Sequence, residues 1–524
     1  MRHRRTVLRA ALALAFASPF ALPATASAAG TTRQIVVDAN APTVARDHFA
    51  DLSVGSDYPG TLIRDDSLAQ LKIAKDELGF RYIRFHAIFH DILGTYKVVN
   101  GKPVYDWTKI DYLYDKLLGM GIKPFVELGF TPEAMKSSDA SIFYWKGNTS
   151  HPKPDQWAGL VDAFVRHVQQ RYGKEEVRSW FFEVWNEPNL DGFWEKADQK
   201  AYFELFDLTS KTLKAIDPDL RVGGPSTAGA AWVPEFLAHT KQSGAAVDFI
   251  TTHTYGVDGG FLDENGQGDQ KLSPKPDGIV GDVVKVRKEI EASYLPKLPL
   301  YFTEWSTSYN PRDLVHDSYI SAAYILSKLK ATEGVAQGMS YWTYTDLFEE
   351  PGPPTAPFEG GFGLMNPQGI RKAAWFAYKY MHELGDQQVQ TADKQSWVTK
   401  DANGVQVLAW DFQTPDMGKK TNRPFFGAVQ PTKKATPLKI QLKGMKPGTY
   451  AVQIYRTGFK ANDAYTAYIE MGKPKTLTGD QLAQLQALAA DKPETKSVKV
   501  GANGAASVQV PMRANDVVLV KIAQ

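Results

Sequence analysis

The chain has 524 residues, a formal net charge of +2 and no cysteine. The missing cysteines exclude disulfide bonds, thiolate nucleophiles and Cys-ligated metals, and the 10 histidines show no HExxH or similar spacing. We therefore expect neither a metal ion nor a cofactor, and the length suffices for one large domain with a smaller module.

The first 28 residues are typical of an export signal. They contain four arginines and no acidic residue, then an apolar stretch and small residues that suit cleavage after Ala26 or Ala28. Arg4 and Arg5 also resemble a twin-arginine motif, so the export route stays open. Without this segment the formal charge becomes −2, and no basic tract favours nucleic acid or a membrane surface. We expect an exported protein, periplasmic or extracellular in a bacterium.

Residues 29–41 contain one short strand, Gln34–Asp38, which we expect to join the C-terminal module. Over residues 42–386, short apolar runs alternate with amphipathic helices such as Ile110–Leu118. Eight runs are predicted as strands: His48–Gly55, Phe80–Ala87, Lys123–Gly129, Trp180–Glu187, Arg221–Pro225, Val247–Tyr255, Leu300–Trp305 and Gly338–Tyr344. Eight buried strands, each followed by a helix, predict an α/β fold of the (β/α)8 TIM-barrel type.

Residues 387–524 have a different pattern. A hairpin with its turn at Asn403-Gly404 precedes segments in which apolar and polar residues alternate. These segments begin at Leu438, Tyr450, Ala506 and Val517. The alternation predicts an accessory β-sandwich, interrupted by one helical insert near Gly479–Ala490.

Two glutamates end predicted barrel strands. Glu187 ends the fourth strand within Asn-Glu-Pro, where the proline stops the strand, and Glu304 ends the seventh within Thr-Glu-Trp. Because the carboxyl ends of barrel strands meet at one rim, we expect these carboxylates to lie across the barrel mouth from each other. Such a pair suits glycosidic cleavage, in which one carboxyl group protonates the leaving oxygen and the other meets the developing oxocarbenium carbon.

The ordered set of motifs around these glutamates resembles the clan A glycoside hydrolases, and within them family 39, which contains β-xylosidases and α-L-iduronidases. The matching segments are Arg84-Phe-His86, Phe182-Glu-Val-Trp-Asn-Glu-Pro188, His253-Thr-Tyr255, Thr303-Glu-Trp-Ser-Thr-Ser-Tyr309, Tyr341-Trp-Thr-Tyr344, Phe348-Glu-Glu350 and Gly360-Gly-Phe-Gly-Leu364. The resemblance extends from about residue 35 to 520. It implies a retaining mechanism with Glu187 as acid/base and Glu304 as nucleophile.

Residues beside the glutamates are predicted to bind or orient the sugar. Asn186 is expected to hydrogen-bond the sugar 2-hydroxyl, and Arg84 to hold Glu304 or the interior acid Glu183 in place. Tyr309 is expected to donate to Glu304 and keep it ionised.

Further candidates line the predicted mouth. By strand parity, His86 points to the same side as Arg84, and His253 to the same side as Tyr255. Each histidine is assigned to the sugar subsite, although a hydrogen-bonded core histidine is the alternative. Glu127, like Glu183, is predicted to be an interior ion-pair partner rather than a catalyst.

A tryptophan and two acids complete the predicted subsite. Trp342 is expected to be a stacking platform for the sugar. The resemblance makes Glu349 and Glu350 candidates to accept hydrogen bonds from the 3- and 4-hydroxyls, where they would repel a uronic acid.

The sequence favours an exo-acting β-xylosidase that works on xylooligosaccharides. The alternatives are an α-L-arabinosidase, an α-L-iduronidase or an endo-acting exopolysaccharide hydrolase, with the same mechanism. A non-catalytic carbohydrate-binding protein is a distant alternative, because neither carboxylate has been lost. Exo or endo action, the exact linkage and the oligomeric state stay open at this stage.

Overall fold

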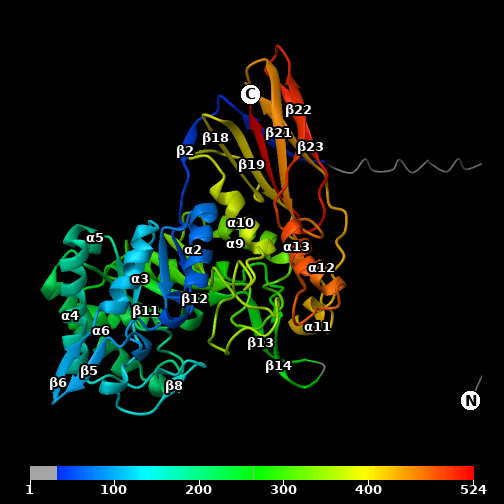
Figure 1. Cartoon of the computed structure of the whole chain (residues 1–524). Helices are drawn as coiled ribbons and strands as arrows, with labels where there is room; N and C mark the ends of the chain where they lie inside the picture. The colour runs from blue at the N-terminus through cyan, green and yellow to red at the C-terminus, as the bar shows by residue number, and fades with distance from the viewer. Residues whose placement is uncertain (1–31, 264, 524) are drawn as a thin grey trace, which may run out of the picture.

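The computed structural model describes residues 32–263 and 265–523, and its centre is a closed barrel of eight parallel strands (Figure 1). The predicted TIM-barrel fold class is confirmed. The export signal expected over residues 1–28 lies outside the described residues. Within the described ranges, no helix combines the length and the apolar character needed to cross a membrane.

The barrel strands correspond to the eight predicted runs, and several are shorter. In chain order they are β3 (Ser53–Gly55), β4 (Tyr82–Phe85), β7 (Lys123–Leu128), β10 (Phe181–Val184), β11 (Arg221–Thr227), β12 (Phe249–Tyr255), β15 (Leu300–Ser306) and β16 (Gly338–Tyr341). The barrel closes where Tyr341 of β16 pairs with Val54 of β3. Phe125, Phe181 and Phe249 fill its interior as one aromatic cluster, so the barrel is a packed core and not a pore.

Helices surround the barrel. They are α1 (Pro59–Leu62), α2 (Asp65–Leu78), α3 (Thr108–Gly119), α4 (Pro154–Tyr172), α5 (Lys174–Arg178), α6 (Gln199–Ile216), α7 (Val233–Ser243), α8 (Val280–Glu291), α9 (Ile320–Thr332) and α10 (Ala373–His382). The sequence dictates their ends locally. Helix α6, for example, begins where the Asp198 side chain accepts from the Ala201 N–H, and it ends before Pro218.

The remaining strands outside the barrel form two sheets and three small hairpins. The seven-stranded sheet has the order β2 (Thr43–Ala45), β17 (Gln387–Val389), β18 (Ser396–Asp401), β19 (Gly404–Trp410), β24 (Val517–Ala523), β21 (Gly448–Thr457) and β22 (Glu494–Val500). The three-stranded sheet has the order β1 (Arg33–Asp38), β20 (Leu438–Lys443) and β23 (Ala506–Val510). Strand β1 pairs in parallel with β20, so the start of the described chain lies beside its C-terminal part.

Short elements decorate both parts of the molecule. The hairpins are β5 (Tyr96–Val99) with β6 (Lys102–Tyr105), β8 (Ser141–Ile142) with β9 (Gly147–Asn148), and β13 (Val257–Leu262) with β14 (Gly268–Leu272). The seven-stranded and three-stranded sheets pack around one buried cluster, to which Val407 and Ile440 belong, and together form a sandwich. The sandwich carries α11 (Asn422–Phe426), α12 (Ala464–Glu470) and α13 (Gly479–Leu488). The last of these is the predicted helical insert.

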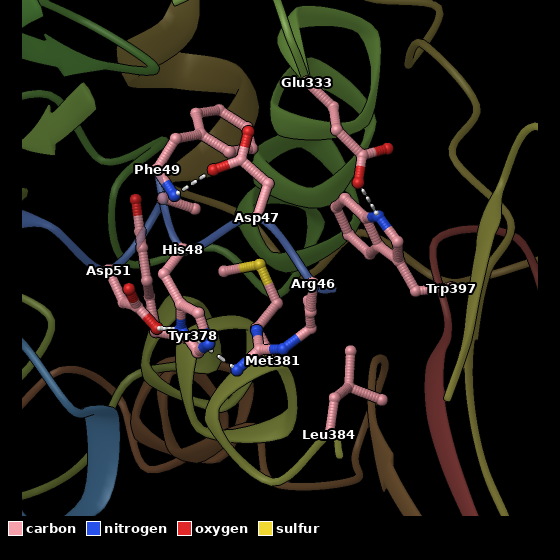
Figure 2. A pocket seen from close by; sticks show the side chains of 11 residues that line it. Arg46, Asp47, His48, Phe49, Asp51, Glu333, Tyr378, Met381, Leu384 and Trp397 are labelled. Atoms are coloured by element: carbon pink, nitrogen blue, oxygen red, sulfur yellow. Dashed lines mark hydrogen bonds and ion pairs between the residues drawn. The ribbon is translucent and has the colours of Figure 1, made fainter. Parts of the chain in front are cut away.

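The sandwich packs on α9 and α10 (Figure 1). The Trp397 indole N–H donates to Glu333 Oε1 at 3.0 Å, and the Trp410 indole N–H donates to Ser327 Oγ at 2.8 Å. Figure 2 shows the side chains around a small cavity beside Trp397. The cavity has a volume of about 20 Å³, which is room for about one water molecule. The junction between barrel and sandwich is therefore close-packed.

Candidate active site

Glu187 owes its position to an irregular turn at the end of β10. Trp185 and Glu187 both have positive φ angles, 69° and 45°, a conformation that non-glycine residues rarely adopt. The Glu187 backbone N–H donates to the Ser226 carbonyl at 2.7 Å, which ties this turn to the end of β11. Strain held in this way by neighbouring structure is typical of functional sites.

Glu187 and Glu304 face the same cavity, which has a volume of about 430 Å³. This volume is within the usual range for small-molecule sites. One carboxylate oxygen of each glutamate and one nitrogen of His253 all lie within 4.8 Å of one another. The two carboxylates are therefore close enough for a retaining pair.

These three residues are also the only His, Asp and Glu side chains of the described ranges that are grouped closely enough to hold a metal ion. The Arg84 guanidinium already provides a positive charge 2.8 Å from Glu304. A catalytic pair of carboxyl groups explains the group without a cation.

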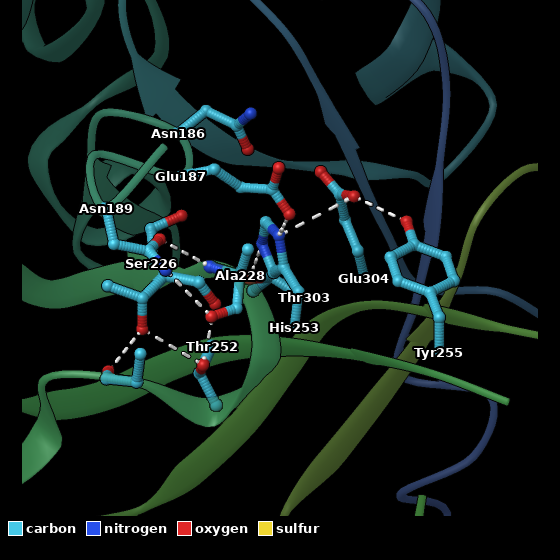
Figure 3. Close-up of polar contacts among 12 residues, drawn as sticks. Asn186, Glu187, Asn189, Ser226, Ala228, Thr252, His253, Tyr255, Thr303 and Glu304 are labelled. Atoms are coloured by element: carbon cyan, nitrogen blue, oxygen red, sulfur yellow. Dashed lines mark hydrogen bonds and ion pairs between the residues drawn. The ribbon is translucent and has the colours of Figure 1, made fainter. Parts of the chain in front are cut away.

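Glu304 has the surroundings of an ionised nucleophile. Arg84 Nη1 donates to its Oε1 at 2.8 Å. The Tyr255 hydroxyl donates to its Oε2 at 2.6 Å (Figure 3). Donors of this kind stabilise a carboxylate in its charged form. Tyr309 is the tyrosine donor that the sequence predicts, whereas in the structure this donor is Tyr255.

Arg84 orients several groups at once. Its guanidinium contacts Glu183 at 2.5 Å, Glu127 at 3.0 Å and Glu304 at 2.8 Å, and it also donates to Asn186 Oδ1 at 2.8 Å. Burial alone would lower the pKa of Arg84, but the three carboxylates outweigh it and raise that pKa. The side chain is fully buried and is absent from the cavity lining, so its role is to position other groups.

Glu187 has the surroundings of a proton donor. Burial raises its pKa to about 7, although the charges of His86 and Arg84 act in the opposite direction. His253 Nδ1 lies 2.8 Å from Glu187 Oε1, and burial lowers the pKa of His253 to about 4. Glu187 is therefore protonated in a large share of molecules at neutral pH, beside a neutral imidazole.

Asn186 presents an unused donor to the cavity. Its Oδ1 accepts from Arg84, whereas its buried Nδ2 has no hydrogen-bond partner among the described residues. Buried polar atoms are nearly always paired, so an orphaned amide at a cavity wall points to a ligand. The Asn186 amide can thus donate to a sugar hydroxyl.

One wall of the cavity combines His86, Trp342 and Glu350. His86 Nδ1 is 2.7 Å from Glu127 Oε2, and its Nε2 is 3.1 Å from Glu350 Oε1. The ring of Trp342 lies 4.7 Å from the His86 ring. Burial raises the pKa of Glu350 to about 7, although His86 opposes this. The wall therefore offers an aromatic surface beside polar acceptors and donors.

The two adjacent acids point in different directions. Glu350 lines the cavity, whereas Glu349 is paired with Arg64 at 2.9 Å and is not part of the lining. Of the two acids predicted to contact sugar hydroxyls, the structure therefore brings only Glu350 to the cavity. The backbone N–H of Glu349 donates to Asp57, which fixes the loop that carries Glu350.

Some predicted residues lie elsewhere than expected, and some lining residues were missed. Tyr309 lines the outer cavity with 47% of its surface exposed, and His253 lies behind the glutamates with no exposed surface. Leu190 and Phe193 line the cavity but belong to no quoted motif, so only their position after Asn-Glu-Pro could have indicated them. Phe362 also lines it, within the quoted Gly-Gly-Phe-Gly segment.

The site thus has two facing glutamates at the ends of the fourth and seventh strands of a closed barrel. Glu304 lies beside cationic and hydroxyl donors, and the pKa of Glu187 is raised. This arrangement defines a glycoside hydrolase of the retaining type. Residues 33–506 match the model of glycosyl hydrolases family 39, and the chain belongs to this family. The family resemblance of the sequence motifs is thereby confirmed.

Characterised and solved relatives agree with this membership. A curated β-xylosidase of Geobacillus stearothermophilus is 38% identical over 385 residues, which cover 71% of this chain and 76% of that protein. The crystal structure of a monomeric β-xylosidase from Caulobacter crescentus is 65% identical, with a TM-score of 0.92, over 94% of this chain and 99% of that one. A family 39 enzyme from Xanthomonas axonopodis is 58% identical, with a TM-score of 0.93, over 96% and 99%.

Proposed function

We propose that this glycoside hydrolase is an exo-acting β-xylosidase that releases xylose from xylooligosaccharides with retention of configuration. The observation that carries the proposal is the pair Glu187 and Glu304 with its unequal surroundings. Relatives of 38% and 65% identity are named β-xylosidases, which supports xylose as the sugar.

In the first step, Glu304 attacks the anomeric carbon and forms a glycosyl ester, while Glu187 gives its proton to the leaving oxygen. Arg84 and Tyr255 hold the attacking carboxylate in place. The Asn186 amide donates to the 2-hydroxyl, a contact that strengthens in an oxocarbenium-like transition state.

In the second step, Glu187 accepts a proton from water, which attacks the anomeric carbon and releases Glu304. The ester has removed the negative charge of Glu304, so the ionised form of Glu187 is easier to reach than in the free enzyme. The two displacements together restore the β-configuration and both starting protonation states.

The cavity wall supports xylose over a uronic acid. Glu350 is an acid at the cavity surface, and in its ionised form it repels a substrate carboxylate. Trp342 and Phe362 also line the cavity and pack with Phe348 in a small apolar cluster. Their rings suit the flat face of a pyranose without a charged substituent.

The test is a panel of p-nitrophenyl glycosides with xylotriose as the natural-type substrate. We expect turnover of the β-xyloside, release of xylose alone from xylotriose, and β-xylose as the first anomer in proton NMR. Preferred turnover of an α-L-arabinoside or an α-L-iduronide, or α-xylose as the first product, would overturn the proposal.

We also propose that the enzyme is exported, because residues 1–28 have a basic start, an apolar stretch and small residues before Ala28. N-terminal sequencing of the protein from a bacterial periplasmic or culture fraction tests this. We expect a mature chain that begins after Ala26 or Ala28, and an intact Met1 in the cytoplasmic fraction alone would contradict it.

A further inference from the structure

A chain of buried polar contacts runs from the barrel interior to Glu187. The Thr303 hydroxyl donates to Glu183 Oε1 at 2.8 Å, and His253 Nε2 lies 3.2 Å from the same hydroxyl oxygen. His253 Nδ1 then lies 2.8 Å from Glu187 Oε1 (Figure 3). Three of these side chains had expected roles in the sequence, whereas Thr303 did not.

The direction of this chain follows from its inner end. Glu183 Oε2 accepts from Arg84 Nε at 2.5 Å, and an ionised carboxylate can only accept hydrogen bonds. Burial alone would raise the pKa of Glu183, but the Arg84 charge outweighs it and lowers that pKa. Thr303 has a single hydroxyl proton, and it uses this proton in the hydrogen bond to Glu183. Its oxygen therefore faces His253 with a lone pair, and His253 Nε2 must carry a proton.

The outer end of the chain follows from the charge of His253. This imidazole is fully buried, and burial lowers its pKa to about 4, so it is neutral and carries only one proton. With that proton on Nε2, Nδ1 is an acceptor. Nδ1 lies 2.8 Å from Glu187 and 3.6 Å from Glu304, and a lone pair facing two carboxylates needs a proton between them.

We propose that Thr303 is a positioning residue that fixes His253 in its Nε2-protonated tautomer, so that Nδ1 accepts the proton of Glu187 and keeps this acid protonated in the resting enzyme. The inference rests on the proposed acid/base role of Glu187 and adds how the protein stores the proton. When Glu187 has given its proton away, its carboxylate faces the Nδ1 lone pair. That contact favours the return of a proton from the attacking water.

Other ionisable groups surround Glu187 and set the background of its titration. They are Arg84 from β4, His86 just after β4, Glu127 from β7, Glu183 from β10, Tyr255 from β12, Glu304 from β15 and Glu350 from the loop after β16. The Thr303 hydroxyl is neutral, so its replacement by an isosteric side chain changes none of these charges. An effect of that replacement on the pH profile therefore acts through the two groups that Thr303 contacts, His253 and Glu183, and Glu183 keeps its contact with Arg84.

The experiment compares the variants Thr303→Val and Thr303→Ser. Valine leaves Nε2 without an acceptor, so His253 changes to the Nδ1-protonated tautomer and donates to ionised Glu187. We expect the basic limb of kcat/KM for Thr303→Val to move down by about one pH unit, the size of one hydrogen bond to a charged group. Thr303→Ser keeps the hydroxyl and is expected to restore the limb.

A matched control is Thr251→Val in β12, whose buried hydroxyl has no hydrogen-bond partner among the described residues. The same change of shape there should leave the limb in place. An unmoved limb in Thr303→Val, or an equal shift in Thr251→Val, would overturn the proposal.

The tautomer can be read without any activity, which separates this inference from the proposed function. Selective ¹⁵N-histidine labelling, with a His253→Asn sample to assign the signal, reports which ring nitrogen carries the proton. We expect a protonated Nε2 and a bare Nδ1 in the wild type, and the reverse in Thr303→Val. A protonated Nδ1 in the wild type would refute the tautomer assignment, even if Glu187 proved to be the acid.

Discussion

At the scale of single residues, the site is organised by what each carboxyl group touches. Glu304 is held by Arg84 and Tyr255, while Glu187 is buried beside a neutral histidine. The same type of side chain thus becomes a nucleophile in one place and an acid in the other.

The Tyr255 hydroxyl is the nearest neutral donor to the nucleophile, at 2.6 Å. We expect Tyr255→Phe to lower kcat/KM for p-nitrophenyl β-xyloside about 10- to 100-fold, the value of one hydrogen bond to a charged group. Tyr114→Phe is the control, because this buried hydroxyl lies in α3 and has no partner among the described residues. Equal rates for Tyr255→Phe and the wild type would show that the contact does not assist catalysis.

The pH profile should report the acid. Burial raises the pKa of Glu187 to about 7, so its acid form persists up to that pH and is lost above it. We expect kcat/KM to fall about tenfold per pH unit above roughly pH 7. With an activated 2,4-dinitrophenyl β-xyloside, Glu187→Ala should lose this limb. A limb that persists in the variant would assign the titration to another group, such as Glu350, whose pKa burial also raises to about 7.

The motifs predicted which residues meet at the barrel mouth but not which atoms each side chain contacts. Tyr255 ends β12 and Tyr309 follows β15, so both lie near Glu304. Only the three-dimensional packing decides that Tyr255 contacts it. Glu349 and Glu350 are neighbours in a loop without a fixed period, so their opposite directions could not be predicted. Thr303 belongs to the Thr-Glu-Trp motif, but the sequence alone does not show which buried groups its hydroxyl contacts.

At the scale of elements, the loop after β16 is fixed by a buried lysine. Lys372 Nζ lies 2.6 Å from Asp317, 2.5 Å from Asp346 and 2.9 Å from the Gly361 carbonyl. The two aspartates in turn accept from the N–H groups of Gly360 and Gly363. This cluster closes the base of the loop that carries Glu350.

Removal of the lysine charge leaves two buried carboxylates unpaired. We expect Lys372→Met to lower the free energy of unfolding by about 3–5 kcal/mol, measured by urea denaturation. Lys72→Met removes an exposed pair with Asp76 and should cost less than about 1 kcal/mol. Similar losses in the two variants would mean that the buried cluster contributes no more than a surface ion pair.

Helices and strands with a clear pattern of apolar residues were predictable from the sequence, whereas polar strands at the edge of a sheet were not. All eight barrel strands were found because their residues are buried on both faces and read as apolar runs. Strand β22 was missed because Glu494–Val500 is largely polar and exposed, as edge strands often are. Strand β3 retains only Ser53–Gly55 of the predicted run, since the preceding residues form turns.

At the scale of the whole molecule, the sandwich and the barrel share a hydrophobic core at their junction, and the two sheets of the sandwich enclose a second core. Trp397 and Trp410 of the sandwich belong to the same buried cluster as α9 and α10. Arg33 of β1 donates to the Trp410 carbonyl at 2.6 Å. The start of the described chain therefore contacts the same junction. The sandwich thereby braces the helices that follow the seventh and eighth barrel strands.

We expect Trp410→Ala to destabilise the protein by about 3–5 kcal/mol, because it leaves a large cavity at this junction. The KM for a β-xyloside should stay unchanged, since Trp410 does not line the cavity of the active site. Leu488→Ala, in the exposed part of α13, is the control and should have little effect on unfolding. Unfolding of Trp410→Ala at the wild-type urea concentration would argue against a shared core.

The central claim is that Glu187 is the acid/base and Glu304 the nucleophile of a retaining pair. Azide rescue of Glu187→Ala and Glu304→Ala on an activated aryl β-xyloside, with the product anomer read by NMR, tests it most directly. The roles assigned here predict β-xylosyl azide from Glu187→Ala, because the covalent intermediate still forms, and α-xylosyl azide from Glu304→Ala. The opposite pattern of anomers would reverse the two roles, and no rescue of either variant would contradict the claim.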